Sequence, residues 1–170
     1  TKLAIAYAAS SLVLVALTAH ARRDAPRMRA LPERPLWMVA GVLGGIASGA
    51  LAVGYLMMLK RLDVELPESS GMSRIAIGIT AIALAPFAEE LFFRGWLFTC
   101  IEDELSPDRK RWLAPLLAAF AFAAVHPPLS SLPVFLLGLV ASVLFARTRA
   151  LGPSIVAHVA HNGIALLVAV

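Results

Sequence analysis

The chain has 170 residues, of which 59% are hydrophobic and only 15% are charged, and its mean hydropathy is +0.80. This composition excludes an ordinary soluble domain, in which about a quarter of the residues are charged. The pI of about 9.8 does not indicate a nucleic-acid partner, because the basic residues lie in loops between apolar segments. The single cysteine, Cys100, excludes an internal disulfide.

Apolar segments recur along the whole chain, without the alternation of a strand. A helical span needs about 20 residues, and open strand edges are not viable in lipid. The sequence therefore predicts an all-α fold, a polytopic transmembrane helical bundle of about six spans at residues 3–19, 36–59, 73–98, 112–126, 132–146 and 153–170. We expect residues 1–72 to form N-terminal transmembrane helices without motifs, and residues 73–170 to form a four-helix core.

Lysine and arginine are divided unevenly between the two sets of loops. Ten lie in the loops after the first, third and fifth segments: Arg22, Arg23, Arg27, Arg29, Arg34, Arg109, Lys110, Arg111, Arg147 and Arg149. Only Lys2, Lys60, Arg61 and Arg74 lie on the other side. By the positive-inside rule, the loops with ten basic residues face the cytoplasm.

The second segment carries Gly41, Gly45 and Gly49, a tandem small-xxx-small spacing. Such spacing lets two helix backbones approach closely. The spacing is typical of packing inside a bundle, and it is also compatible with a homodimer face.

The third segment places Glu89, Glu90 and Arg94 at membrane depth. Each such charge costs roughly 2.5–3.5 kcal/mol on insertion scales, so these charges are expected to pair, to line a wet cavity or to take part in chemistry. Glu90 and Arg94 have the i,i+4 spacing of an intrahelical ion pair. Glu89 points about 100° away from Glu90 and is free to face a cavity.

His126 is predicted to meet Glu89 across a helical hairpin. Eighteen residues separate Glu89 from the turn at 107–108, and eighteen separate that turn from His126. In an antiparallel pair the two side chains therefore lie at the same level. Pro127 and Pro128 end the helix abruptly, and non-helical backbone at membrane depth is tolerated where it is buried in protein or lines water.

In the last segment, His158 and Asn162 are four residues apart and share a helix face. The distance from Pro153, a favoured first-turn residue, puts His158 at a depth compatible with that of Glu89. His161 is interpreted as a neighbour of these residues and not as a catalyst.

Three motifs occur in order: EExxxR at 89–94, FxxxH at 122–126 and HxxxN at 158–162. Together they resemble the CPBP family, the CAAX prenyl proteases of the Rce1 type and their bacterial relatives. The motifs match at every defining position, and the resemblance covers about the last four spans.

The resemblance implies an intramembrane endopeptidase of the glutamic type, without a metal or another cofactor. The catalytic residues that it implies are Glu89, His126, His158 and Asn162. The first two would activate a water and the last two would stabilise the oxyanion, with Glu90 and Arg94 as structural support of the site. The substrate would be a membrane-associated or lipidated protein or peptide. A short six-span core is more typical of the bacterial members, so the location would be a bacterial inner membrane. The count of residues from the hairpin turn, which lies on the side with ten basic residues, puts the site toward the cytoplasmic half.

Other functions stay open at this point. Glu89, His126 and His158 could bind zinc in a membrane protease, since zinc takes His and carboxylate ligands, although there is no HExxH motif. The chain could also be a non-catalytic immunity or scaffold protein whose charges stabilise the bundle. A transporter is disfavoured, because no inverted repeat is evident.

Overall fold

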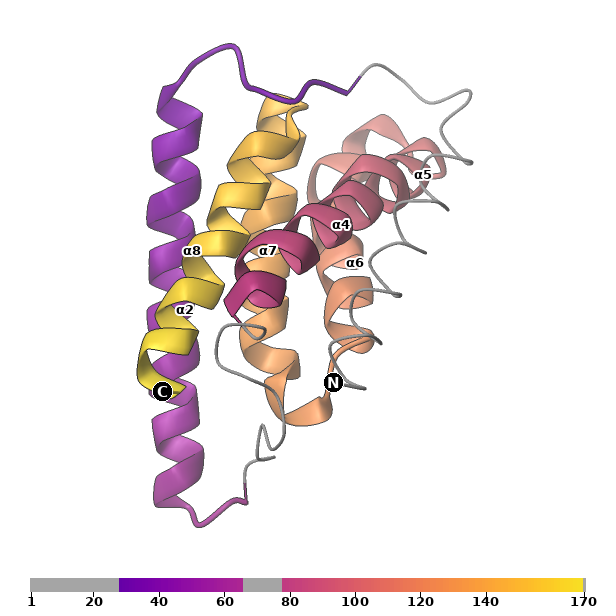
Figure 1. The fold of residues 1–170 in the computed structure, drawn as a ribbon. Coiled ribbons are helices and arrows are strands. Elements are labelled where there is room, and N and C mark those ends of the chain that lie inside the picture. The colour runs from indigo at the N-terminus through magenta and orange to yellow at the C-terminus, as the bar shows by residue number, and fades with distance from the viewer. Residues whose placement is uncertain (1–27, 66–77, 170) are drawn as a thin grey trace.

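The computed structural model describes residues 28–65 and 78–169, and within these ranges the fold is all-helical (Figure 1). The α-helices are α2 (Leu36–Arg61), α4 (Ala85–Phe92), α5 (Phe98–Asp103), α6 (Pro107–Ala124), α7 (Ser131–Thr148) and α8 (Leu151–Ala169). Short π-helical turns, η2 (Thr80–Leu84) and η3 (Phe93–Leu97), flank α4, and a 3-10 turn, η4 (Pro128–Ser130), precedes α7. The predicted all-α class is confirmed, while the predicted first span, at 3–19, lies outside the described residues.

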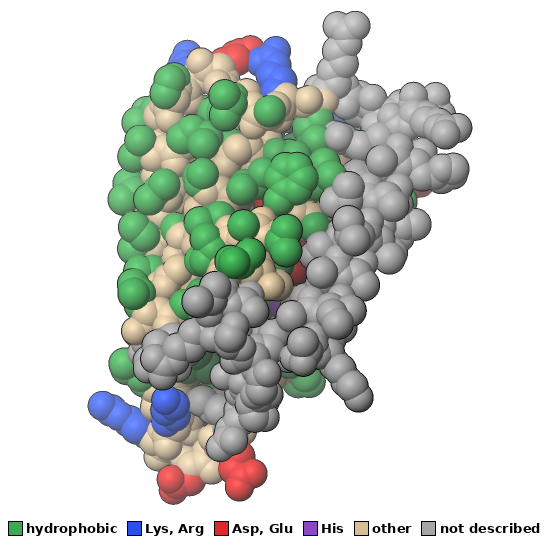
Figure 2. Space-filling model, viewed as in Figure 1, with side chains coloured by type: hydrophobic (Ala, Val, Ile, Leu, Met, Phe, Trp, Pro, Cys, Tyr) green, Lys and Arg blue, Asp and Glu red, His purple; other side chains and the backbone are tan. Residues whose placement is uncertain are grey.

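Two helices in the described part of the chain are long and apolar enough to cross a membrane, Leu36–Arg61 and Pro128–Thr148. A shorter apolar helix covers Leu151–Leu167. Figure 2 shows hydrophobic side chains over the length of the bundle and charged side chains at its two ends, which is the distribution a bilayer favours. The number of six spans stays a prediction.

The described parts of the three loops predicted to share the cytoplasmic side, from residue 28 onward, lie together at one end of the bundle, the upper end in Figure 1. The backbone N–H of Arg29 donates to the carbonyl of Arg149 at 3.1 Å, and the N–H of Leu151 donates to the carbonyl of Arg29 at 3.1 Å. The Arg149 guanidinium also binds the Glu102 carboxylate of α5, at 2.5 and 2.8 Å. This arrangement agrees with the predicted alternation of the loops, and the side of the membrane that they face stays a prediction.

Helix α2 packs along α8 through its glycines. A Cβ built on Gly45 would lie 2.1 Å from the carbonyl oxygen of Ala157, and one on Gly41 would lie 2.4 Å from that of Pro153. Gly49 likewise lies against the backbone of α8. The packing interpretation of the stripe is therefore confirmed. In the single chain α8 occupies this face of α2, and a homodimer through these glycines stays a prediction.

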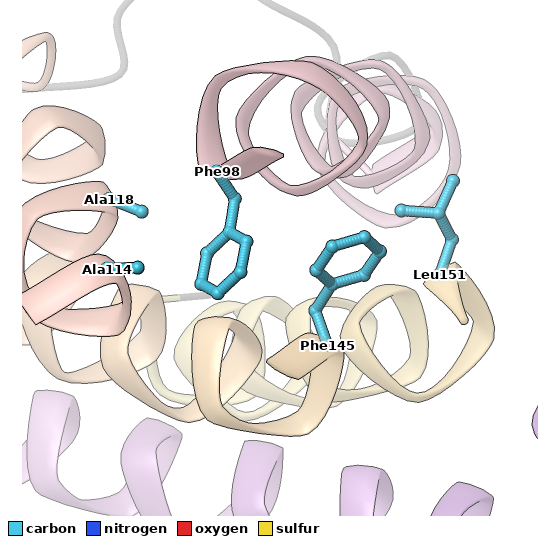
Figure 3. Close-up of a cluster of buried hydrophobic side chains, with 5 residues drawn as sticks. All are labelled: Phe98, Ala114, Ala118, Phe145 and Leu151. Carbon is cyan, nitrogen blue, oxygen red and sulfur yellow. The ribbon is translucent and has the colours of Figure 1, made fainter. Parts of the chain in front are cut away.

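A hydrophobic cluster joins the helices near the basic end (Figure 3). Phe98 of α5 and Phe145 of α7 meet edge to face, with ring centroids 5.4 Å apart. Ala114 and Ala118 of α6 and Leu151 of α8 complete the buried set. Because small alanines let the α6 backbone come close to these rings, the cluster fixes α5, α6, α7 and α8 relative to one another.

Candidate active site

Glu90 and Arg94 form a fully buried ion pair, with Arg94 Nη1 3.0 Å from Glu90 Oε1 and neither side chain exposed. The predicted i,i+4 pair is thus confirmed. Arg94 Nη2 also donates to the carbonyl of Gly138 in α7 at 3.0 Å. The guanidinium lies over the ring of Phe122 in α6, 4.6 Å from its centroid. This inner pair, Glu90 and Arg94, therefore ties α4 and η3 to both neighbouring helices.

His158 of α8 contacts both carboxylates of α4. Its Nδ1 lies 2.9 Å from Glu90 Oε1, and its Nε2 lies 3.8 Å from Glu89 Oε2. Since Glu90 pairs with Arg94, its carboxylate is a hydrogen-bond acceptor, and the Nδ1 of His158 carries the proton. The Nε2 of His158 is left to face Glu89.

His126 lies just beyond the C-terminal end of α6, which stops at Ala124. Its Nδ1 lies 2.7 Å from the carbonyl oxygen of Phe122, and a carbonyl only accepts, so Nδ1 donates. Its ring packs edge to face on the ring of Phe122, at 4.7 Å. These contacts aim the Nε2 of His126 at Glu89 Oε2, 3.9 Å away.

The Nε2 atoms of His126 and His158 thus approach the same oxygen of Glu89. Separations of 3.8 and 3.9 Å are too long for direct hydrogen bonds and are within reach of one bridging water. The counting argument along the hairpin correctly predicts that Glu89 and His126 lie at one level. The side chains of Glu89 and His126 are 18% and 24% exposed, whereas the inner pair is fully buried.

The other two polar residues of α8 have different places. Asn162 is half-buried one helical turn beyond His158. His161 turns toward α2, where its Nδ1 lies 3.0 Å from the hydroxyl of Ser48, and both side chains are buried. That hydroxyl also contacts the carbonyl of Gly45, at 3.1 Å. His161 therefore belongs to the contact between α2 and α8.

Sequence reasoning missed two partners of the polar residues. The first is the backbone carbonyl of Gly138, which accepts a hydrogen bond from Arg94. No sequence signal identifies a backbone acceptor. Ser48 does carry a signal, since it is a hydroxyl residue beside Gly49 in the glycine stripe of α2. Sequence reasoning also missed that α4 lies between two π-helical turns, a feature often found at functional sites.

In residues 28–65 and 78–169, no group of three or more His, Cys, Asp or Glu side chains has the arrangement of a metal site. The donors that converge on Glu89 are two imidazoles that each use Nδ1 for another hydrogen bond.

A bundle of apolar helices that encloses two carboxylates, a guanidinium and two imidazoles defines a membrane-type helical protein with a polar centre. The chain matches the family model for Type II CAAX prenyl endopeptidase Rce1-like over residues 71–164, more than half of its length, and it belongs to this family. The family is membrane-embedded and points to CAAX-type membrane protease activity. The resemblance seen in the sequence is confirmed, and all three motifs lie within the matched residues. Neither the curated proteins nor the solved structures gave a significant match.

Proposed function

We propose that this chain is an intramembrane endopeptidase of the glutamic type, which hydrolyses a peptide bond in a membrane-associated or lipidated protein or peptide. The observation that carries the proposal is the approach of the Nε2 atoms of His126 and His158 to one oxygen of Glu89. A carboxylate and an imidazole within one-water reach of each other are suited to deprotonate a shared water.

In this proposal Glu89 and His126 activate the attacking water. The water oxygen forms the new bond to the scissile carbonyl carbon, and its proton passes to the Glu89 carboxylate. The hydrogen bond from His126 Nδ1 to the Phe122 carbonyl fixes the ring, so that Nε2 is the nitrogen presented to the water. The same proton is then delivered to the leaving amine as the peptide C–N bond breaks.

His158 and Asn162 stabilise the negative charge that develops on the carbonyl oxygen. In this role His158 carries a proton on each ring nitrogen: Nδ1 donates to the Glu90 carboxylate at 2.9 Å, which fixes the ring, and Nε2 donates to the oxyanion. The amide of Asn162, one turn along α8, supplies a second donor. Preorganised donors of this kind typically contribute 10²–10³-fold each to the rate.

The inner pair braces the site and takes no part in proton transfer. We further propose that residues 73–170 form the catalytic core, that the chain spans a bacterial inner membrane several times, and that the site lies in its cytoplasmic half. The distribution of basic loops at one end of the bundle supports this orientation.

The proposal is tested by a comparison of peptide termini in native-host membranes. One strain carries the wild-type chain, a second carries Glu89→Gln, and a third carries Glu104→Gln as a matched control at an exposed carboxylate. We expect termini that are present with the wild type and with Glu104→Gln and that are lost with Glu89→Gln. These termini also identify the substrate.

Two outcomes would contradict the proposal. Identical termini in all three strains, with equal expression and equal thermal stability of the variants, would favour the non-catalytic immunity or scaffold function. Loss of the termini on treatment with a chelator, and their return with added zinc, would favour the zinc-dependent protease.

A further inference from the structure

A second polar feature lies at the basic end of the bundle, away from Glu89. A cavity of about 230 Å³ opens between the segment before α2 and the end of α7, lined by Pro32, Glu33, Arg34, Trp37, Arg147 and Thr148. Along α7, Arg147 lies nine residues beyond Gly138 of the candidate active site, about 14 Å at the rise of an α-helix. The cavity is therefore separate from that site.

The cavity is lined by two guanidinium groups that form no ion pair with any residue the structure describes. In the described ranges, Arg34 and Arg147 form no ion pair, whereas Arg29 pairs with Glu33 and Arg149 pairs with Glu102. The hydrogen bond and the charge of Arg29 lower the pKa of Glu33, with a smaller contribution from the charge of Arg34, so this carboxylate is ionised and has Arg29 as its ion-pair partner. The net charge left for a ligand is positive.

The position of the cavity matches the headgroup level of a bilayer. It lies between the first turn of Leu36–Arg61 and the last turn of Pro128–Thr148, the two helices that are long and apolar enough to span a membrane. Trp37 stands at the same level, and tryptophan is enriched at the membrane–water interface. Figure 2 shows charged side chains at this end, directly above the hydrophobic side chains.

We propose that this cavity binds the phosphate of an anionic phospholipid headgroup, with Arg34 and Arg147 as its ligands. A guanidinium presents a planar fork of donors that matches phosphate oxygens two at a time. Basic pockets between membrane helices on the cytoplasmic side are suited to anionic headgroups. The acyl chains would then lie along the apolar surfaces of α2 and α7. A free phosphate has no acyl chains and would not contact these surfaces.

The test is a lipid titration of the full chain in nonionic detergent, with bound lipid counted by native mass spectrometry. We expect the first phosphatidylglycerol to bind at least about tenfold more tightly than phosphatidylcholine. Phosphatidylcholine has the same phosphate but also a choline cation, which the two guanidiniums repel, whereas the net negative headgroup gains a few-fold from each guanidinium. The double variant Arg34→Gln/Arg147→Gln should lose this preference. The matched control Arg109→Gln/Lys110→Gln removes two charges from the same end, outside the cavity, and should keep it.

Four results would overturn the proposal. Equal loss in both double variants would indicate diffuse attraction to the basic end, and an unchanged preference in Arg34→Gln/Arg147→Gln would exclude the two arginines. Binding of soluble glycerol phosphate as tightly as the lipid would make free phosphate the ligand. Arginine-dependent binding of an acidic peptide, without a lipid preference, would make the cavity a protein-binding site. Glu89→Gln should leave the lipid preference unchanged, so the result is independent of the proposed hydrolysis.

Discussion

Helix α8 is held by two faces of opposite character. Toward α2 it presents backbone, and the α2 glycines approach Pro153 and Ala157 so closely that a Cβ would meet their carbonyl oxygens at 2.4 and 2.1 Å. Toward α4 it presents His158, which reaches the buried Glu90 carboxylate at 2.9 Å. Close backbone packing holds the face toward α2, and a hydrogen bond to a buried carboxylate holds the face toward α4.

The difference shows how a helix without motifs supports a polar site. Buried charges position one another poorly unless their geometry is already set, because desolvation offsets much of their attraction. Close backbone packing supplies that geometry, since tightly packed interiors allow little displacement. Helix α2 therefore sets the position of α8, and the charged residues depend on it.

Arg94→Lys tests the charged contacts between α4 and its neighbours, and it has the largest expected effect. An ammonium cannot bind Glu90 and the Gly138 carbonyl with the same fork, so we expect a loss of roughly 3 kcal/mol or more, the range for breaking a buried pair. The measurement is the Tm of the purified chain in detergent. Arg109→Lys, at an exposed arginine, is the matched control and should leave the Tm unchanged.

The outcome separates structural support from catalysis. Glu89→Gln should keep the wild-type Tm, because among the described residues Glu89 has no hydrogen-bond partner that the change removes directly. If Arg94→Lys were as stable as the wild type and merely less active, the inner pair would belong to the reaction and not to the framework.

The packed face is tested by Gly45→Ala. The new methyl group would meet the Ala157 carbonyl, a backbone atom that cannot rotate away, and overpacking of this kind costs roughly 1–3 kcal/mol. Gly54→Ala in the same helix is the matched control, because no atom of the described residues lies within 4 Å of its Cβ position. There we expect a gain of up to about 1 kcal/mol from helix propensity. Equal Tm values for the two variants would show that α2 and α8 can separate without cost.

The polar link between α2 and α8 is tested by Ser48→Ala. The change removes a hydroxyl 3.0 Å from His161 Nδ1 and should cost about 1 kcal/mol, the usual net value of such a hydrogen bond. Ser142→Ala in α7 is the control, since its buried hydroxyl has no partner in the described residues, and its loss should be neutral or stabilising. A larger Tm decrease for Ser142→Ala than for Ser48→Ala would contradict this assignment.

Much of the candidate site follows from sequence spacing, because helix geometry is regular. The i,i+4 spacing predicts the pair Glu90 and Arg94, and equal counts along a hairpin predict the level of Glu89 and His126. The segments predicted at 36–59 and 153–170 correspond to Leu36–Arg61 and Leu151–Ala169. Such predictions need only the rise and the turn of one helix or of one hairpin.

The contacts between helices distant in the sequence could not be predicted in this way. The bond from His158 to Glu90 depends on how α8 is rotated about its axis, which no local pattern sets. The Gly138 acceptor is a backbone carbonyl, common to every residue. The glycine stripe of α2 was compatible with packing inside the bundle and with a homodimer face, since small residues permit close approach to any helix.

The smallest change in Tm is expected for substitutions at the basic end of the bundle, where α8 begins. Arg149 closes α7 with a left-handed backbone, φ 54°, a conformation that favours glycine. Arg149→Gly removes the pair between the half-exposed Arg149 and Glu102, worth about 1 kcal/mol on the scale of surface pairs, and relieves this strain, so the net Tm change should be near zero. Glu102→Gln removes the pair and leaves the strain, and it should lower the Tm more than Arg149→Gly does. The opposite ranking would mean that this ion pair, and not the backbone turn, sets the start of α8, and charge would then position both ends of the helix.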